Sequence, residues 1–138
     1  MQRRDFLALT AALASIPFSL SAASNRLPYS PGLVASSLAV GETVFLDFKA
    51  SWCTTCRAQE KVISALKSLN PDYEKHITII DVDWDLFGRS DLVSWLKIPR
   101  HFTLVVLKDN EELGRIVAGT RRRDIKSLLD IALSAVPS

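Results

Sequence analysis

Apolar, β-prone segments alternate along the chain with segments whose apolar residues recur at helical spacing. Residues 44–49 are rich in valine, phenylalanine and leucine and predict a buried strand. Residues 57–69 predict a helix that ends before Pro71, because proline cannot continue a helix. The apolar face of this helix comprises Val62, Ile63, Leu66 and Leu69.

The same kind of pattern continues to the end of the chain. Residues 77–82 predict a second strand, and residues 86–96 predict a second helix. A third strand at 102–107 is joined to a fourth at 113–117 by a polar hairpin connection. Thr120 is the predicted N-cap of a last helix.

These segments give the order β-α-β-α-β-β-α. Two strands joined through a helix form a parallel pair, and a hairpin adds an antiparallel pair. The sequence therefore predicts an α/β domain with a mixed central sheet of about four core strands, flanked by helices.

The first 23 residues have the layout of a secretory signal peptide. Arg3 and Arg4 precede an apolar run at 8–20, and small residues at 21–23 offer a cleavage site after Ala23. The arginine pair resembles the twin-arginine export signal. An ordinary Sec signal and an uncleaved anchor are the alternatives, and all three place the domain outside the cytoplasm.

The composition fits one globular domain behind this signal. Of the 138 residues, 48% are hydrophobic and 23% are charged, which fits a chain with a real core. The formal net charge of +2 gives no support to nucleic-acid binding. Residues 24–39, rich in proline, glycine and serine, predict a leader segment, so the domain is expected at 40–138.

Cys53 and Cys56 are the only two cysteines, and they stand where a predicted strand gives way to a predicted helix. A Cys-x-x-Cys pair can cycle between dithiol and disulfide, hold half of a metal site, or form a permanent small-loop disulfide. The position between a strand and a helix favours redox chemistry. A permanent disulfide that closes so small a loop would stabilise little by chain entropy.

Four sequence features occur in an order typical of one known family. They are Phe45-Leu46-Asp47-Phe48, then Trp52-Cys53-x-x-Cys56, then Ile98-Pro99 before a strand, and Gly119 before the last helix. Together they resemble the thioredoxin family over residues 40–133. The resemblance implies a thioredoxin-like fold and a thiol–disulfide oxidoreductase that needs no cofactor and no metal.

The resemblance also implies roles for the residues of the motif. Cys53 would be the exposed nucleophile, its thiolate stabilised by the N-terminus of the helix. Cys56, one turn further and more deeply placed, would resolve the mixed disulfide by attacking Cys53. Trp52 would shield the motif and offer a flat contact surface, with core packing as the alternative. Thr54 and Thr55 would lie at the same substrate-binding surface.

Asp47 is unusual because a carboxylate inside an apolar strand costs free energy unless its pKa shifts or it finds partners. The resemblance implies that it is buried behind Cys56 and accepts its proton. The alternative is an aspartate on a solvent face of the strand. Classical family members carry a lysine near this acid, and Ile79 is expected at that place here. Asp47 is therefore expected to be still more reluctant to ionise.

Pro99 would be the family's cis-proline, facing the cysteines. The alternative is a trans proline that ends a helix. The backbone of Ile98 would offer its N–H and C=O groups to a bound peptide. His101 could tune the thiolate or bind a metal, although an ordinary histidine at a strand edge is the simpler interpretation.

These inferences predict an enzyme that exchanges disulfides with exported proteins in the periplasm, more of the reductase or isomerase type. We expect a monomer that acts on protein thiols and disulfides, takes electrons from a membrane protein, and touches the membrane only if the signal stays uncleaved. One alternative is a copper-delivery module that uses the two thiolates and His101. Another is a scaffold without redox activity, which would not need a buried acid.

Overall fold

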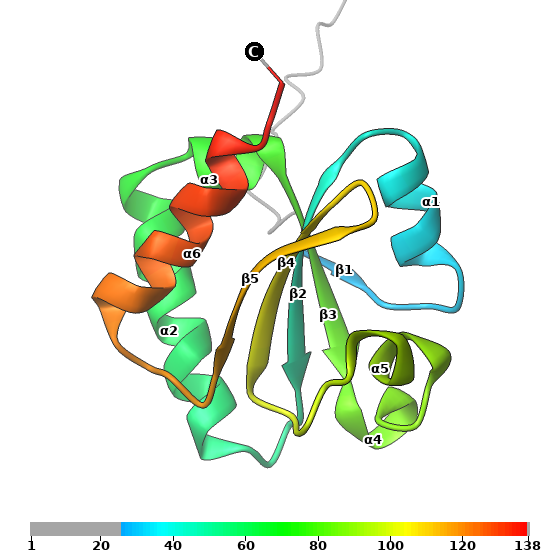
Figure 1. Ribbon diagram of the computed structural model, residues 1–138. Coiled ribbons are helices and arrows are strands. Elements are labelled where there is room, and N and C mark those ends of the chain that lie inside the picture. Colours follow the sequence, from blue (N-terminus) through cyan, green and yellow to red (C-terminus); the bar gives the residue numbers. More distant parts are fainter. Residues whose placement is uncertain (1–25, 138) are drawn as a thin grey trace, which may run out of the picture.

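A five-stranded mixed sheet forms the centre of the protein in the computed structural model, which describes residues 26–137 (Figure 1). The strand order is β1-β3-β2-β4-β5. Strand β3 runs parallel to β1 and β2, whereas β4 pairs antiparallel with β2 and β5. The strands are β1 (Arg26–Pro28), β2 (Thr43–Lys49), β3 (Ile77–Asp83), β4 (Thr103–Lys108) and β5 (Glu111–Val117).

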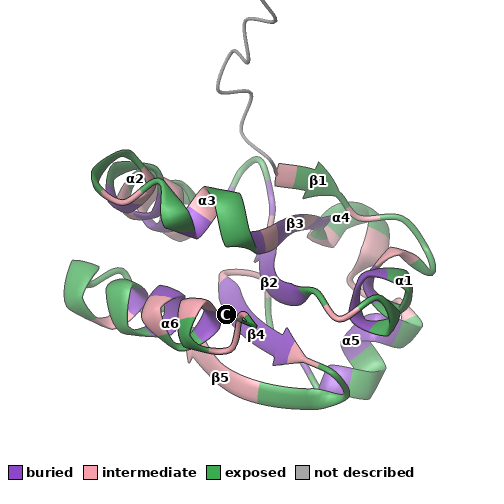
Figure 2. Cartoon of the chain, turned by 90° about the horizontal axis from the view of Figure 1, so that it is seen from above, coloured by how far each residue is buried: buried purple, intermediate pink, exposed green. Residues whose placement is uncertain are grey.

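Helices cover both faces of this sheet (Figures 1 and 2). One face carries α2 (Thr54–Leu69), α3 (Asp72–His76) and α6 (Arg122–Ser134). The other face carries α1 (Leu33–Ala39), α4 (Trp84–Phe87) and α5 (Asp91–Leu96). None of the described helices is long and apolar enough to cross a membrane.

The alternation of side chains along β2 divides the core between the two faces. Leu46 and Phe48 pack with residues of α1 and α5, whereas Phe45 packs with residues of α2 and α6. Asp47 follows Phe45 by two positions and therefore points toward the α2 side of the sheet. This placement brings an acidic side chain beneath the helix that carries the cysteines.

The predicted α/β fold is confirmed, with one strand more than expected. The predicted leader at 24–39 is not a simple lead-in, because it contains β1 and α1. Strand β1 pairs with the edge of β3, and Val34 and Leu38 of α1 are buried in the core. A strand of 3 residues that includes a proline has too little periodicity for the sequence to reveal it.

Two other predicted boundaries differ from the structure. The helix expected at 86–96 is split into α4 and α5, and Ser90 caps the second through a bond from the N–H of Val93. The N-cap of α6 is Arg121, not Thr120, and it makes no capping bond through its side chain. The predicted signal peptide, residues 1–23, lies outside the described residues.

Candidate active site

Cys53 and Cys56 form a disulfide at the N-terminus of α2, with their Cα atoms 5.3 Å apart. Cys53 is the N-cap residue in extended conformation, and its sulfur accepts a hydrogen bond of 3.0 Å from the backbone N–H of Cys56. A turn between β2 and α2 brings the N–H of Cys53 to the carbonyl of Ala50 at 3.1 Å. Unpaired N–H groups at a helix start stabilise a thiolate, so this position suits a reactive cysteine.

Both cysteines are buried in this disulfide form. Cys53 is 4% exposed and Cys56 is 2% exposed. Ala50, Trp84 and Phe102 pack against them. The expectation of an exposed Cys53 is therefore wrong for this form, because aromatic side chains from α4 and from the segment before β4 cover the pair.

Trp52 presents an aromatic surface beside the disulfide. Its side chain is 58% exposed, which excludes the core-packing alternative. Its ring centroid lies 4.7 Å from that of His101, and its indole N–H donates to the Asp85 carboxylate at 3.1 Å. Thr54 is exposed and Thr55 half-buried in the first turn of α2. Trp52 and the two threonines are thus sequence neighbours of the cysteines, and His101 lies against Trp52 and Phe102.

The residue before β4 that packs on the cysteines is Phe102, not Pro99. The bond before Pro99 is trans and its side chain is exposed, so the expected cis-proline is not seen. Phe102 takes a positive φ of 56° and donates its N–H to the carbonyl of Phe48 at 2.6 Å. Ile98 is buried, and its N–H donates to Val93 at 3.0 Å, so that N–H is already used within the protein.

Gln59 fixes the segment that carries Phe102, a role that sequence reasoning did not find. Its side chain is fully buried one turn beyond Cys56. The amide nitrogen donates to the carbonyls of Phe102 at 3.1 Å and Gly119 at 3.0 Å. A polar residue on the buried side of an amphipathic helix was the only available signal.

Asp47 is fully buried, which excludes the alternative of a solvent-facing side chain. One carboxylate oxygen accepts a bond of 2.6 Å from the guanidinium of Arg26. Burial raises the pKa of Asp47 from 3.8 to about 6, against the lowering effect of Arg26. The nearby carboxylate of Asp81 raises this pKa further, and Lys49 lowers it.

The strand register places Asp81 opposite Asp47. The prediction that Ile79 would be the neighbour of Asp47 on the next strand is therefore wrong by two positions. Ile79 pairs with Phe45 instead. A second carboxylate thus stands beside the buried acid, and the positive charge comes from Arg26 at the start of β1. That residue lay in the predicted leader, and for this reason sequence reasoning missed it.

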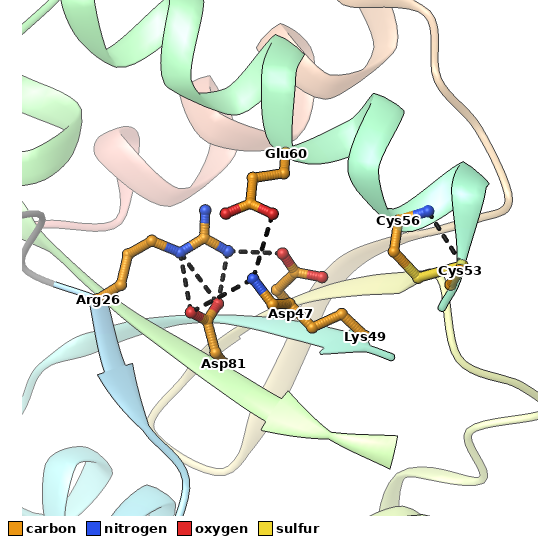
Figure 3. A network of polar contacts seen from close by, with 7 residues as sticks. All are labelled: Arg26, Asp47, Lys49, Cys53, Cys56, Glu60 and Asp81. Atoms are coloured by element: carbon orange, nitrogen blue, oxygen red, sulfur yellow. Dashed lines mark hydrogen bonds and ion pairs between the residues drawn. A yellow bond between two sulfur atoms is a disulfide. The ribbon is translucent and has the colours of Figure 1, made fainter. Parts of the chain in front are cut away.

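A network of ion pairs connects the buried acid with the surface (Figure 3). Lys49 lies 3.7 Å from Asp81 and 3.4 Å from Glu60 of α2. Arg26 joins Asp81 to Asp47. The second oxygen of Asp47, Oδ1, has no hydrogen-bond partner among the residues that the structure describes. In Figure 3 this oxygen is turned away from Arg26, to the side on which Cys56 lies.

The histidine, cysteine and acidic side chains of residues 26–137 contain no group of three placed to hold a metal ion. His101 instead contacts aromatic rings, at 4.7 Å from Trp52 and 4.5 Å from Phe102 between ring centroids. A dithiol–disulfide pair at a helix start, with a buried acid under the same helix, defines a redox site on a thioredoxin-like sheet.

Comparison with known proteins assigns this site to a family. Residues 35–131 match the thioredoxin family model, so the chain belongs to the thioredoxin family and carries the disulfide pair of a thiol–disulfide oxidoreductase. Thioredoxin of Chlamydia trachomatis is 37% identical over 91 residues, which cover 65% of this chain and 80% of that protein. Thioredoxin H5 of rice is 34% identical over 79 residues, which are 57% of this chain and 54% of the rice protein.

Solved structures support the same fold. The Trxlp protein of Edwardsiella tarda EIB202 superposes with a TM-score of 0.65 at 21% identity, covering 75% of this chain and 97% of that one. At this identity the likeness concerns the fold alone.

Proposed function

We propose that the protein reduces or isomerises disulfide bonds of exported proteins. The observation that carries the proposal is the Cys53–Cys56 disulfide at the start of α2, with the fully buried Asp47 under the same helix. A buried acid whose pKa is raised to about 6 can exchange protons near neutral pH. Such a group is well suited to deprotonate a neighbouring thiol.

The reaction cycle follows from thiol–disulfide exchange. In the reduced protein the Cys53 thiolate attacks one sulfur of a partner disulfide, forms a mixed disulfide and releases the other partner sulfur as a thiolate. Cys56 gives its proton to Asp47 and attacks the Cys53 sulfur, which releases the partner as a dithiol. The protein is left with the Cys53–Cys56 disulfide, and a dithiol donor must then return two electrons.

The proposal that the protein is exported to the periplasm rests on the sequence of residues 1–23. The pair Arg3-Arg4, the apolar run and the small residues before Ser24 support a twin-arginine-type signal. A reductant in an oxidising compartment needs a supply of electrons. We infer that a membrane protein provides them and that the domain works as a monomer.

Trapping of partners tests which proteins are substrates. Cys56→Ser leaves Cys53 able to attack but removes the resolving thiol, so mixed disulfides should accumulate. We expect Cys56→Ser, expressed with its N-terminus intact, to be recovered in covalent complexes with exported proteins that dithiothreitol releases. The double variant Cys53→Ser/Cys56→Ser is the control and should trap nothing. Complexes with cytoplasmic proteins only would contradict the proposed compartment, and none at all would contradict the mechanism.

The reduction potential tests the direction of electron flow. Thr54 and Thr55 are neutral and place no cationic side chain between the cysteines that would favour the thiolate. A less stabilised thiolate makes the dithiol a better reductant. We expect equilibration with glutathione to give a value closer to thioredoxin, about −270 mV, than to a strong oxidant, about −120 mV. A value near the second figure would contradict the reductase assignment.

A further inference from the structure

We propose that Arg26 is a positioning residue of the redox site, which holds the Asp47 carboxylate as an anion ready to accept the proton of Cys56. This inference rests on the proposed function, since it concerns the proton acceptor of the exchange reaction. Arg26 is the first residue of β1 and stands 21 positions before Asp47 in the chain. It supplies the positive charge that contacts Asp47 directly, whereas Lys49 of β2 forms its ion pairs with Asp81 and Glu60.

The geometry of Arg26 is fixed by two carboxylates. Its Nε lies 3.0 Å and 3.1 Å from the two oxygens of Asp81, and its Nη2 lies 2.5 Å from Asp81 and 2.6 Å from Asp47. The side chain of Arg26 is only 8% exposed. A planar guanidinium held by several charge-assisted hydrogen bonds has little freedom to move. The Nη2 group of Arg26 is therefore already oriented toward Asp47.

Asp81 works as the anchor of this arrangement. It stands directly opposite Asp47 in the parallel pair of β2 and β3, and opposite Pro28 in the pair of β1 and β3. Two carboxylates side by side disfavour ionisation of the more buried one. Arg26 opposes this effect at Asp47, because it attracts the anionic form of that carboxylate.

The remaining charged groups around Asp47 do not replace Arg26. Lys49, on the same strand, forms its ion pairs with Asp81 and Glu60, and no ion pair with Asp47 occurs within 4.0 Å. Strand β4 places the apolar Leu104 opposite Asp47. Helix α2 contributes Glu60, which is half-buried, and the disulfide sulfur of Cys56. Within the described chain, Arg26 is therefore the cation in direct contact with the buried acid.

The contact with Arg26 leaves the second carboxylate oxygen of Asp47 available to accept a proton. Oδ2 is occupied by Arg26, whereas Oδ1 is buried without a hydrogen-bond partner in the described structure. A buried acceptor of this kind is costly unless it receives a proton or a donor. Arg26 thus holds one oxygen and leaves the other, on the cysteine side, to take the proton.

Arg26→Met removes the charge while keeping an unbranched apolar side chain. Its test is the titration of the Asp47 carboxyl carbon by NMR in the oxidised, full-length protein, together with the pH profile of disulfide reduction. We expect the Asp47 midpoint to move up by about one pH unit or more, the size of effect that an opposite charge in contact exerts. The activity profile should move by the same amount, with activity recovered at high pH.

Three further variants make the result decisive. Arg26→Lys should give an Asp47 midpoint between those of the wild type and Arg26→Met. Lysine keeps the positive charge but cannot form the paired hydrogen bonds of a guanidinium. Arg26→Gln removes the charge but keeps amide donors, so it should also move the midpoint up, and it tests the inference if Arg26→Met does not fold. Arg115→Met removes another ion-paired arginine, on β5, and should leave the midpoint unchanged.

The outcomes separate this inference from the proposed function. A midpoint that stays within about 0.3 pH units in Arg26→Met, or in Arg26→Gln if the first variant is unfolded, overturns the positioning role. A uniform loss of activity at every pH, without a shift, shows a merely structural role and also overturns it. A shifted titration in a protein whose wild type exchanges no disulfides would support Arg26 and contradict the oxidoreductase proposal.

Discussion

Cys53→Ser is expected to abolish catalysis of disulfide reduction and leave only the rate of the uncatalysed reaction with dithiothreitol. The thiolate is the nucleophile in disulfide exchange, and a serine hydroxyl is not ionised near neutral pH. Cys53 is the residue whose sulfur accepts the N–H bond at the start of α2, so the remaining Cys56 cannot take over its position. The measurement is the initial rate of reduction of a model protein disulfide with dithiothreitol in excess.

Cys56→Ser is the matched control for this result. Both variants lose the same disulfide, which joins residues 3 positions apart. Closing a loop of this size lowers the chain entropy of the unfolded state by an amount worth about 2 kcal/mol of stability. They should therefore unfold at similar urea concentrations. Cys56→Ser should still attack a partner disulfide once per molecule, whereas Cys53→Ser should not. Full catalytic activity in Cys53→Ser would show that the assignment of the attacking cysteine is wrong.

The fold was predictable because each core element carries its own periodicity. The strands at the centre of the sheet are continuous apolar runs, and the cysteine helix has a clear apolar face, so local pattern was sufficient. Strand β1 has only 3 residues, and its pairing with β3 depends on contacts between residues more than 50 positions apart. Such contacts leave no local signal.

The same reason explains which site residues the sequence could reveal. Cys53, Cys56 and Asp47 stand within one short stretch, and a charged residue inside an apolar strand is visible without a structure. Arg26 reaches this stretch only through β1, and Phe102 reaches it only through the turn before β4. Proline is conspicuous in a sequence, and Pro99 was therefore a candidate, whereas the positive φ of Phe102 leaves no sequence signal.

Asp47→Asn is expected to make the protein more stable at neutral pH and slower as an oxidoreductase. Burial raises the pKa of Asp47 from 3.8 to about 6, so the folded protein holds a proton that the unfolded chain releases between these values. The wild type therefore loses stability as pH rises from about 4 to 6 and stays at the lower level above that. Asparagine is neutral at every pH and avoids this loss.

The expected gain follows from the size of the pKa shift. A shift from 3.8 to about 6 corresponds to at most about 3 kcal/mol in the free energy of unfolding at pH 8, and to little difference at pH 4. Loss of the ion pair with Arg26 reduces the gain, although Arg26 keeps its bonds to Asp81. Urea unfolding of both proteins at pH 4, 6 and 8 measures the change.

The activity of Asp47→Asn should change in the opposite direction. If Asp47 accepts the proton of Cys56, its loss should slow the resolution of the mixed disulfide by about 10²-fold at pH 7, the low end of what a positioned base contributes. The rise of the wild-type rate around pH 6 should disappear as well. Rapid-mixing measurements of the release of a partner from the mixed disulfide give this rate directly.

Asp109→Asn is the matched control, because it makes the same chemical change at an exposed aspartate in the β4–β5 hairpin. Its φ of 54° lies in the left-handed region, which asparagine tolerates as well as aspartate does. This variant should keep the stability, the rate and the pH dependence of the wild type. A resolution rate in Asp47→Asn equal to that of Asp109→Asn, at every pH, would exclude Asp47 as the proton acceptor. If Asp47→Asn gained stability while its resolution rate stayed unchanged, the buried carboxyl would lower the stability of the wild type without taking part in disulfide exchange.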